Sequence, residues 1–348
     1  MIPEKRLAVK RTIPFLLIGL AIFIFYLYVF VGIPEIIQII QRINLFYYSL
    51  AVVLIFLSTL AYSLAWQYFL RPLSVNVPLR KTFLYVWIGA FIDILVPAES
   101  ISGDASRVYL MSKGSGENAG KVVASVVSHR ILSIVITLGS LIIGSLSLFI
   151  LQIHVEAFVL NFIIFVIFGT AISLVFMFLL CLRERMTQKI IDPLLRFFAF
   201  ISRGRLQLTS LRSKTRKALR AFHQAIGVLG KNPRSLIQPV FFSVVSWFLS
   251  VLLTFFVFFS LGYKVNIAVL IIVYCIVCSI QTVPIGIIGG VGILDIAMIS
   301  LYALLGVPHD ISASATVLIR AITVWFRLLI GFVAIQWVGI KASRSISR

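Results

Sequence analysis

The chain has few acidic residues and few charged residues of any kind. Of its 348 residues, 12% are charged, and 11 are Asp or Glu against 31 Lys or Arg. Hydrophobic residues make up 61% of the sequence, and the mean hydropathy is +1.10. A soluble domain does not need so much apolar surface, whereas runs of about 20 apolar residues span a bilayer. The composition therefore predicts an all-α polytopic helical membrane protein.

Histidine and cysteine are also scarce. The four histidines have no zinc-type spacing, and the three cysteines all lie in apolar runs. Although Cys275 and Cys278 have Cys-x-x-Cys spacing, no polar partners accompany them, so we interpret them as packing residues. The stretch 114–121 departs from a P-loop because Ser115 replaces its first glycine. We therefore expect no metal, no cofactor and no enzymatic activity.

The basic residues lie mainly between the apolar runs. Thirteen of them fall between residues 183 and 234, and smaller groups occur at residues 5–11, 71–81 and 341–348. Basic residues collect on the cytoplasmic side of membrane proteins, where anionic headgroups are a sufficient partner. The net charge of +20 therefore predicts membrane topology and no nucleic-acid partner.

Apolar runs long enough to cross a membrane recur along the chain. About six full spans are predicted, at residues 13–32, 47–70, 122–151, 157–182, 236–262 and 311–340. The first is too long for the core of a signal peptide, so we interpret it as a retained helix. Residues 1–348 are predicted to form a single integral membrane domain that contains the basic cytoplasmic segment 183–234.

Two shorter apolar pieces, near 82–96 and 267–306, are broken by proline, glycine and acidic residues. The breaks contain Pro97, Glu99, Gly103 and Asp104 in the first piece, and Pro284, Gly289, Gly290, Gly292 and Asp295 in the second. Paired broken segments in the two halves of a membrane protein point to a transport site. Irregular backbone is tolerated at membrane depth only beside protein or a water-filled cavity, and glycine allows it.

The number of membrane crossings and the positions of the basic clusters together favour a re-entrant element at the first break. A full crossing at 82–96 would place the basic segment 183–234 outside, whereas re-entry keeps every dense basic cluster inside. Both termini then lie on the cytoplasmic side, and the protein is expected in the cytoplasmic membrane. By the same count, the second break enters the membrane from the outer face. The count of crossings does not decide whether its two arms re-enter the membrane or cross it.

The basic segment 183–234 contains one amphipathic pattern. Leu219, Phe222, Ile226 and Leu229 follow helical spacing with basic residues around them. This pattern predicts a basic helix lying on the inner membrane surface.

Charged residues within the apolar parts are the candidate functional groups, because an intramembrane charge is costly unless it is paired or hydrated. The residues predicted to bind an anionic lipid headgroup are Arg107, Arg130, Arg320 and Arg327. Guanidinium groups bind phosphate oxygens bidentately. Arg320 and Arg327 are seven residues apart and are expected on one face of the last helix.

The acidic residues are predicted to gate the path or orient these arginines. This group comprises Glu99, Asp104 and Asp295, with His129 beside Arg130. An alternative is that Asp104 and Asp295 pair with arginines to hold the broken segments together, and both roles are compatible. The helix that begins near Ile293 is expected to add a positive N-terminal end.

At these residues the chain resembles the lysylphosphatidylglycerol synthase transmembrane-region family, which is also described as flippase-like or UPF0104. Its marks are a proline followed by Gly-acidic-x-x-Arg, an arginine on the next helix, a Pro-x-x-x-Gly-Gly-x-Gly-x-x-acidic stretch and an arginine in the closing helix. These marks match Pro97, Gly103, Asp104, Arg107, Arg130, Pro284, Gly289, Gly290, Gly292, Asp295 and Arg320. The chain departs from the family pattern at His129 and Ser133, where Glu and Asp are frequent, and at Asp295, where Glu is usual.

The resemblance implies a flippase-like lipid translocase for an anionic phospholipid or a polyprenyl-phosphate-linked lipid. Lysyl transfer is not expected, because the family's aminoacyl-transferase domain is not visible here. The alternative is a non-transporting scaffold or regulator of a lipid-modifying enzyme or a membrane-associated glycosyltransferase, recruited through segment 183–234.

Overall fold

The structure is a computed structural model that describes residues 38, 41, 43–96, 101–152, 155–189, 191, 193, 208–282 and 288–346. These residues form helices and connecting turns without a β-strand. Five helical stretches are long and apolar enough to cross a membrane, at residues 45–73, 119–150, 157–182, 233–260 and 309–338. Each matches a predicted span, so the polytopic helical fold is confirmed. The predicted span 13–32 lies outside the described residues.

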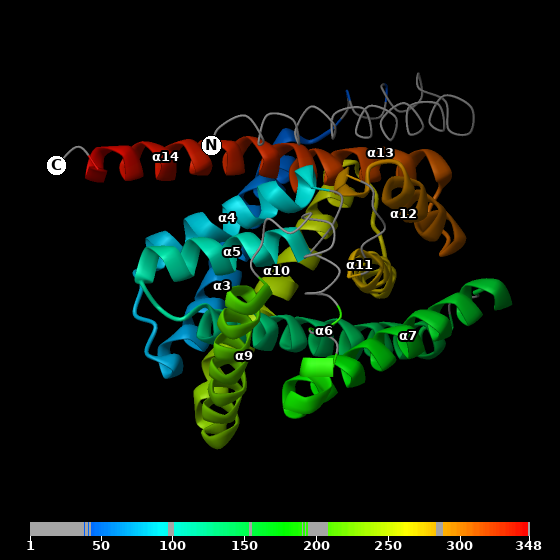
Figure 1. Cartoon of the computed structure of the whole chain (residues 1–348). Helices are drawn as coiled ribbons and strands as arrows, with labels where there is room; N and C mark the ends of the chain where they lie inside the picture. The colour runs from blue at the N-terminus through cyan, green and yellow to red at the C-terminus, as the bar shows by residue number, and fades with distance from the viewer. Residues whose placement is uncertain are drawn as a thin grey trace.

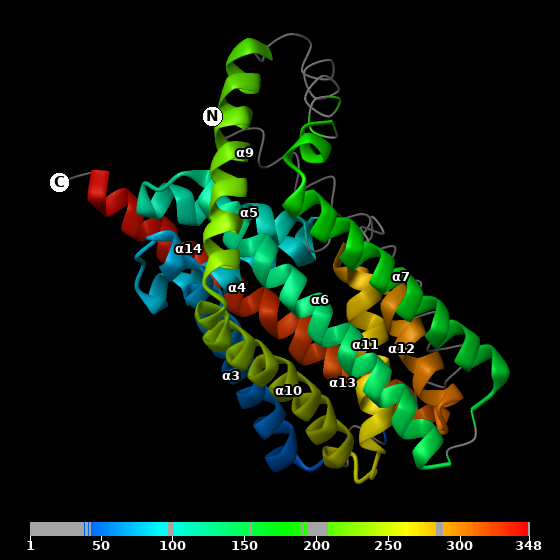
Figure 2. The same ribbon diagram turned by 90° about the horizontal axis from the view of Figure 1, so that it is seen from below.

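Two of the spans make the most extensive helix–helix contact of the described bundle. Helix α3 (Leu45–Leu70) and helix α10 (Ile237–Ser260) pack side by side along much of their length (Figure 2). The Asn44 side chain accepts a hydrogen bond from the backbone N–H of Phe46 at 3.0 Å, which satisfies one free donor at the start of α3. Ser246 of α10 donates to the carbonyl of Ser58 at 2.9 Å and so joins the two helices through a buried polar contact.

The first broken segment is a helical hairpin. Helix α4 (Leu79–Leu95) and helix α5 (Ile101–Ser115) pack against each other (Figure 1). Gly89 and Gly103 lie at their contact, and a Cβ atom on Gly103 would collide with Asp93 and with the carbonyl of Gly89. The two glycines therefore allow an approach that larger residues would prevent. The predicted Pro97 and Glu99 lie outside the described residues.

The second broken segment comprises helix α11 (Ile267–Gln281), the short turn η4 (Ile288–Gly290) and helix α12 (Ile293–Leu304). Its backbone is left-handed at Gly289, Gly290 and Gly292, with φ of 57°, 60° and 91°. Only glycine adopts these values without steric cost. Pro284 lies outside the described residues.

The two broken segments meet inside the bundle. A Cβ atom on Gly289 would lie 3.2 Å from the side chain of Ile94, at the end of α4. The turn η4 packs on α4 more broadly as well. Segments nearly 200 positions apart in the sequence thus share one contact.

The last span is interrupted between its two arginines. Helix α13 (His309–Arg320) continues through a π-helical turn, η5 (Ala321–Phe326), into helix α14 (Arg327–Ile346). Helix α14 packs on α4, and α13 packs on α12. A π-helical turn within a helix often marks a functional position.

The long helices α6 (Ala119–Ile150) and α7 (Ala157–Leu182) complete the described bundle, with α6 against α11. The predicted amphipathic helix is α9 (Leu208–Lys231), which stands away from one end of the bundle (Figure 2). Its Leu219, Phe222 and Leu229 are buried, and it packs on α6 at Gly120, where a Cβ atom would collide with the carbonyl of Ala218. The apolar face is covered by protein, which differs from the prediction of a helix lying on a lipid surface.

Candidate functional site

Asp104 joins the first broken segment to α6. Arg107, one helical turn further along α5, forms an ion pair with its Oδ1. Arg130 of α6 donates from Nη1 to Oδ2 at 2.9 Å. One carboxylate therefore holds two arginines that the sequence predicted as headgroup ligands.

Arg107 is almost fully buried, at 7% exposure. Its guanidinium lies 5.2 Å from the ring centre of Tyr62 and 5.3 Å from that of Trp66, both on α3. Such cation–π contacts stabilise a desolvated guanidinium. Its Nη1 makes no hydrogen bond within the described part of the chain.

Asp295 performs a similar role in the second broken segment. Its Oδ2 accepts the backbone N–H of Gly292 at 2.7 Å, and its Oδ1 lies 2.6 Å from Nε of Arg320. Arg320 also donates from Nη2 to the carbonyl of Gly289 at 2.6 Å. The pairing considered from the sequence is thus present, and it fixes the irregular backbone at Gly289. The positive N-terminal end of α12 is occupied by Asp295.

Asp93 caps the second arm of the hairpin. Its Oδ1 accepts hydrogen bonds from the Ser102 hydroxyl at 2.8 Å and from the Gly103 N–H at 2.6 Å. A carboxylate at this position satisfies free donors at the start of α5 and is favoured by the helix dipole. Asp93 lies beside the first break. The sequence analysis did not predict that its side chain lines the cavities described next.

Two adjoining cavities lie between these groups. The larger, of about 380 Å³, is lined by Arg107, Arg320 and Arg327 together with Asp93. The smaller, of about 250 Å³, is lined by Asp93, Asp104, Arg107, His129 and Arg130. Asp93 and Arg107 line both cavities, so the four predicted arginines lie around two neighbouring cavities. The larger volume is within the range of small-ligand sites.

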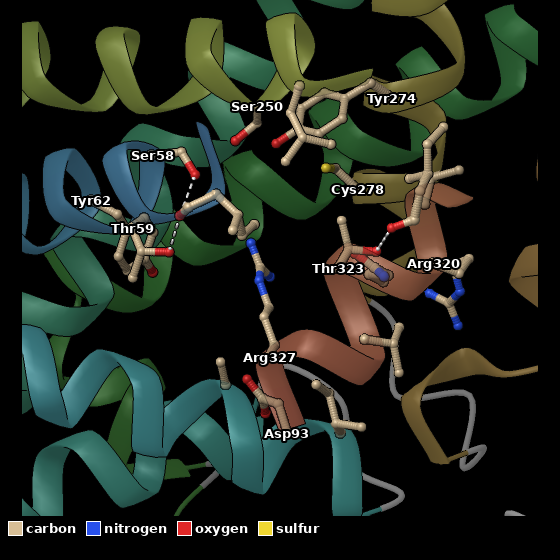
Figure 3. Close-up of a pocket in the computed structure, with 18 of the residues that line it drawn as sticks. Ser58, Thr59, Tyr62, Asp93, Ser250, Tyr274, Cys278, Arg320, Thr323 and Arg327 are labelled. Atoms are coloured by element: carbon tan, nitrogen blue, oxygen red, sulfur yellow. Dashed lines mark hydrogen bonds between the residues drawn. The ribbon is translucent and has the colours of Figure 1, made fainter. Parts of the chain in front are cut away.

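Arg327 differs from the other three arginines. Its side chain extends into the larger cavity between Thr59 and Tyr274, and Asp93 lies near the backbone end of this side chain (Figure 3). It makes no hydrogen bond or ion pair with any residue that the structure describes, and its electrostatic neighbours there include Asp93 at longer range. Arg320 lines the same cavity, as expected from the spacing of seven, but its guanidinium is turned to Gly289 and Asp295.

His129 is buried among aromatic rings of α3. Its ring centre lies 4.2 Å from that of Tyr62 and 5.9 Å from that of Phe69. Neither ring nitrogen makes a hydrogen bond within the described ranges. The structure therefore places His129 beside the smaller cavity without a direct bond to Asp104 or to an arginine.

The sequence prediction missed the hydroxyl groups of the cavity walls. Four of them follow one face of α10, at Ser243, Ser246, Ser250 and Thr254. Their spacing of three or four residues was visible in the sequence and would have indicated a polar stripe in an otherwise apolar span.

The chain is a multi-pass helical membrane protein in which two broken segments meet at a buried, arginine-lined cavity. The model of the lysylphosphatidylglycerol synthase TM region matches residues 16–331, so the chain belongs to this family.

Archaeal relatives match over nearly their whole length. A UPF0104 membrane protein of Pyrococcus horikoshii is 27% identical, with 91% of this chain and 94% of the relative covered. UPF0104 membrane proteins of Methanothermobacter thermautotrophicus and Methanocaldococcus jannaschii are 26% and 24% identical. Those matches cover 91% and 93% of this chain, and 92% and 94% of the relatives.

Proposed function

We propose that the protein is a lipid translocase that moves an anionic phospholipid or a polyprenyl-phosphate-linked lipid between membrane leaflets, without catalysing a covalent reaction. The observation that carries the proposal is Arg327, whose guanidinium projects into the cavity without a hydrogen-bonded carboxylate among the described residues. Arg327 is partly buried, and a charge at membrane depth is costly unless it is paired or hydrated. A phosphate group entering the cavity would supply that partner.

The distribution of ion pairs supports an anionic ligand. Asp104 is paired with Arg107 and Arg130, and Asp295 is paired with Arg320. No described carboxylate is hydrogen-bonded to Arg327. Guanidinium groups bind phosphate oxygens with two parallel hydrogen bonds, which suits Arg327 to a phosphate headgroup.

The proposal also includes the membrane in which the protein acts and its orientation there. The protein acts in the cytoplasmic membrane with both termini and α9 on the cytoplasmic side, because this arrangement keeps the basic clusters inside. The headgroup passes by way of the two cavities while the lipid tails stay in the bilayer. During this passage the headgroup is guided to and from Arg327 by three other arginines, Arg107, Arg130 and Arg320.

Reconstitution into vesicles tests the proposal. Phosphatidylcholine vesicles would contain tail-labelled fluorescent phosphatidylglycerol, and dithionite would bleach the label in the outer leaflet. Wild-type protein should allow bleaching beyond the outer-leaflet fraction. Arg327→Gln should slow this movement roughly ten- to hundredfold, as expected for a lost charged hydrogen bond.

Lys121→Gln is the matched control, because it removes the same charge from a side chain that is 37% exposed and lines neither cavity. It should leave the rate unchanged. If Arg130→Ala and Arg320→Ala also move lipid as fast as wild type, the site assignment is wrong. Bleaching equal to that of protein-free vesicles would contradict translocation altogether.

A second candidate, a scaffold for a lipid-modifying enzyme or a glycosyltransferase, is favoured by α9. Arg216, Lys217 and Arg220 are exposed on a helix that stands away from the bundle. Capture of such an enzyme by wild-type protein but not by a variant with these three residues changed to Gln, combined with no lipid movement, would support this function instead.

A further inference from the structure

Helix α7 is closely packed against the bundle in its first half only. Val159, Ile163 and Val166 are buried, and their spacing of four and three residues places them on one face of the helix. From residue 167 to residue 180 no residue is buried, and burial resumes at Cys181. The rest of the described chain therefore does not cover the inner face of the second half of α7 closely.

The smaller cavity reaches α7 in this loosely packed half. Thr170 of α7 lines the cavity together with Ile136 and Thr137 of α6. All three side chains are only partly buried. On this side, the cavity is bounded by two helix faces that are not fully covered by protein.

Thr137 and Thr170 lie at the same level of the two helices. Thr137 precedes Ile150, the last residue of α6, by 13 positions, and Thr170 follows Ala157, the first residue of α7, by 13 positions. The helices run antiparallel and pack side by side (Figure 2). Because the rise per residue is the same in both, equal distances from the connecting turn give equal depths. Two hydroxyl groups thus occur at one depth, near the middle of two otherwise apolar spans.

A line of polar side chains leads along α6 from this point to the paired arginines. Arg130, Ser133 and Thr137 are spaced by three and four residues, so they share one face of α6, and all three line the smaller cavity. Arg130 is bonded to Asp104 and has a side chain that is 21% exposed. Nη1 of Arg107, in the same cavity wall, is buried without a hydrogen-bond partner in the described part of the chain. Polar groups therefore connect the α6–α7 contact with two of the arginines.

Helix α7 is also the described span that is easiest to displace. In its most apolar stretch 11% of the residues are buried, the lowest share of the five described spans, against 22% for α6. An element with few buried apolar contacts opens at low cost in free energy. A lipid whose tails stay in the bilayer can bring its headgroup into the cavity only between neighbouring spans.

We infer that the smaller cavity opens sideways to the lipid between α6 and the second half of α7, and that headgroups enter and leave through this lateral portal. Thr137 and Thr170 are the polar residues at its mouth. The buried first half of α7 holds the two helices together, and residues 167–180 separate from α6. This inference rests on the proposed function and specifies how lipid reaches its site.

A thiol trap tests headgroup entry without requiring translocation. Single cysteines, Thr170→Cys or Ser173→Cys, are placed in a chain whose Cys181, Cys275 and Cys278 are changed to Ala. Ser173 lies on the same helix and is exposed. The vesicles contain phosphatidylethanolamine whose amine carries a maleimide, so the headgroup keeps the single negative charge of its phosphate.

Thr170→Cys should react with this lipid at least about tenfold faster than Ser173→Cys, because a charged headgroup reaches Ser173 only through hydrocarbon, where a charge is costly. A second lipid, with the maleimide at the end of an acyl chain, should react faster with Ser173→Cys. The reversed order excludes a general difference in thiol reactivity. Equal labelling of the two positions by the headgroup lipid would overturn the inference.

Reversible closure tests the role of the portal in lipid movement. In the same cysteine-free background, Thr137→Cys, Thr170→Cys would be joined by a short cleavable cross-linker in the vesicle assay. Movement of phosphatidylglycerol should fall to the rate of protein-free vesicles, and cleavage of the cross-link should restore it.

A matched pair close to the connecting turn controls for cross-linking itself. Leu148 precedes Ile150 by two positions, Val159 follows Ala157 by two, and both are buried. Joining Leu148→Cys, Val159→Cys should leave the rate unchanged, because the helices are already packed there.

The outcomes separate the portal from the proposed function. Headgroup trapping at Thr170→Cys by a protein that moves no lipid would overturn translocation and leave the portal intact. Lipid movement that the cross-link between positions 137 and 170 does not slow would overturn the portal and leave translocation intact. The trap decides the question even if the two cysteines cannot be joined.

Discussion

Replacing Arg320 by glutamine removes one partner of the buried ion pair that joins the last span to the second broken segment. The Arg320 and Asp295 side chains are 8% and 2% exposed, and their charged atoms are 2.6 Å apart. The substitution also removes the hydrogen bond to the carbonyl of Gly289. Asp295 would then remain buried with only the Gly292 N–H as a hydrogen-bond partner among the described residues.

Removal of one partner of a buried pair typically costs about 3–5 kcal/mol, because the remaining charge stays desolvated. We expect a loss of this size in the free energy of unfolding. Asp295→Asn should cost a similar amount. The double variant Asp295→Asn, Arg320→Gln should cost less than the sum of the two, since the second change removes a charge that the first left unpaired.

The assay is reversible unfolding in mixed micelles of mild detergent and dodecyl sulfate, followed by tryptophan fluorescence and circular dichroism. Glu117→Gln is the control, because Glu117 and Lys121 form an ion pair at 3.0 Å whose side chains are 31% and 37% exposed. Exposed pairs contribute at most about 1 kcal/mol. A cost for Arg320→Gln no larger than that for Glu117→Gln would show that the buried ion pair stabilises the fold no more than an exposed one.

Two further predictions concern close contacts made by glycine. Gly103→Ala should destabilise the α4–α5 hairpin by more than 1 kcal/mol, on the order of an overpacked core position, because its Cβ atom would collide with Asp93. Gly139→Ala, on a helix and with open space around it, should be neutral or slightly stabilising in the same unfolding assay. Gly120→Ala should loosen α9 from α6, measured as faster protease cleavage in segment 183–234, with Gly169→Ala as the control; equal cleavage rates would contradict the α6–α9 packing.

Hydropathy was sufficient to predict the spans. Each of the five described spans begins within a few residues of its predicted start. A long apolar segment in a bilayer can satisfy its backbone hydrogen bonds only by forming a helix, so its position follows from hydropathy. The positive φ values at Gly289, Gly290 and Gly292 agree with the irregular backbone expected from their spacing. The predicted pairing of acidic residues with arginines also followed from the cost of an isolated buried charge.

Other features depend on three-dimensional packing that spacing does not encode. The contact between Gly289 and Ile94 joins the two breaks, and nothing in the linear sequence specifies it. The π-helical turn at Ala321–Phe326 gives Arg320 and Arg327 different surroundings, although their spacing alone predicts equivalent positions. The apolar stripe of α9 has the same pattern whether protein or lipid covers it, so the sequence did not predict its packing on α6.

The most direct test of the headgroup site is a density map of the protein in nanodiscs that contain phosphatidylglycerol. We expect a phosphate group in the larger cavity with its oxygens at hydrogen-bonding distance from Arg327, about 2.7–2.9 Å. A map in which Arg327 is bonded to a carboxylate of the protein, with headgroup density only outside the helical bundle, would contradict it.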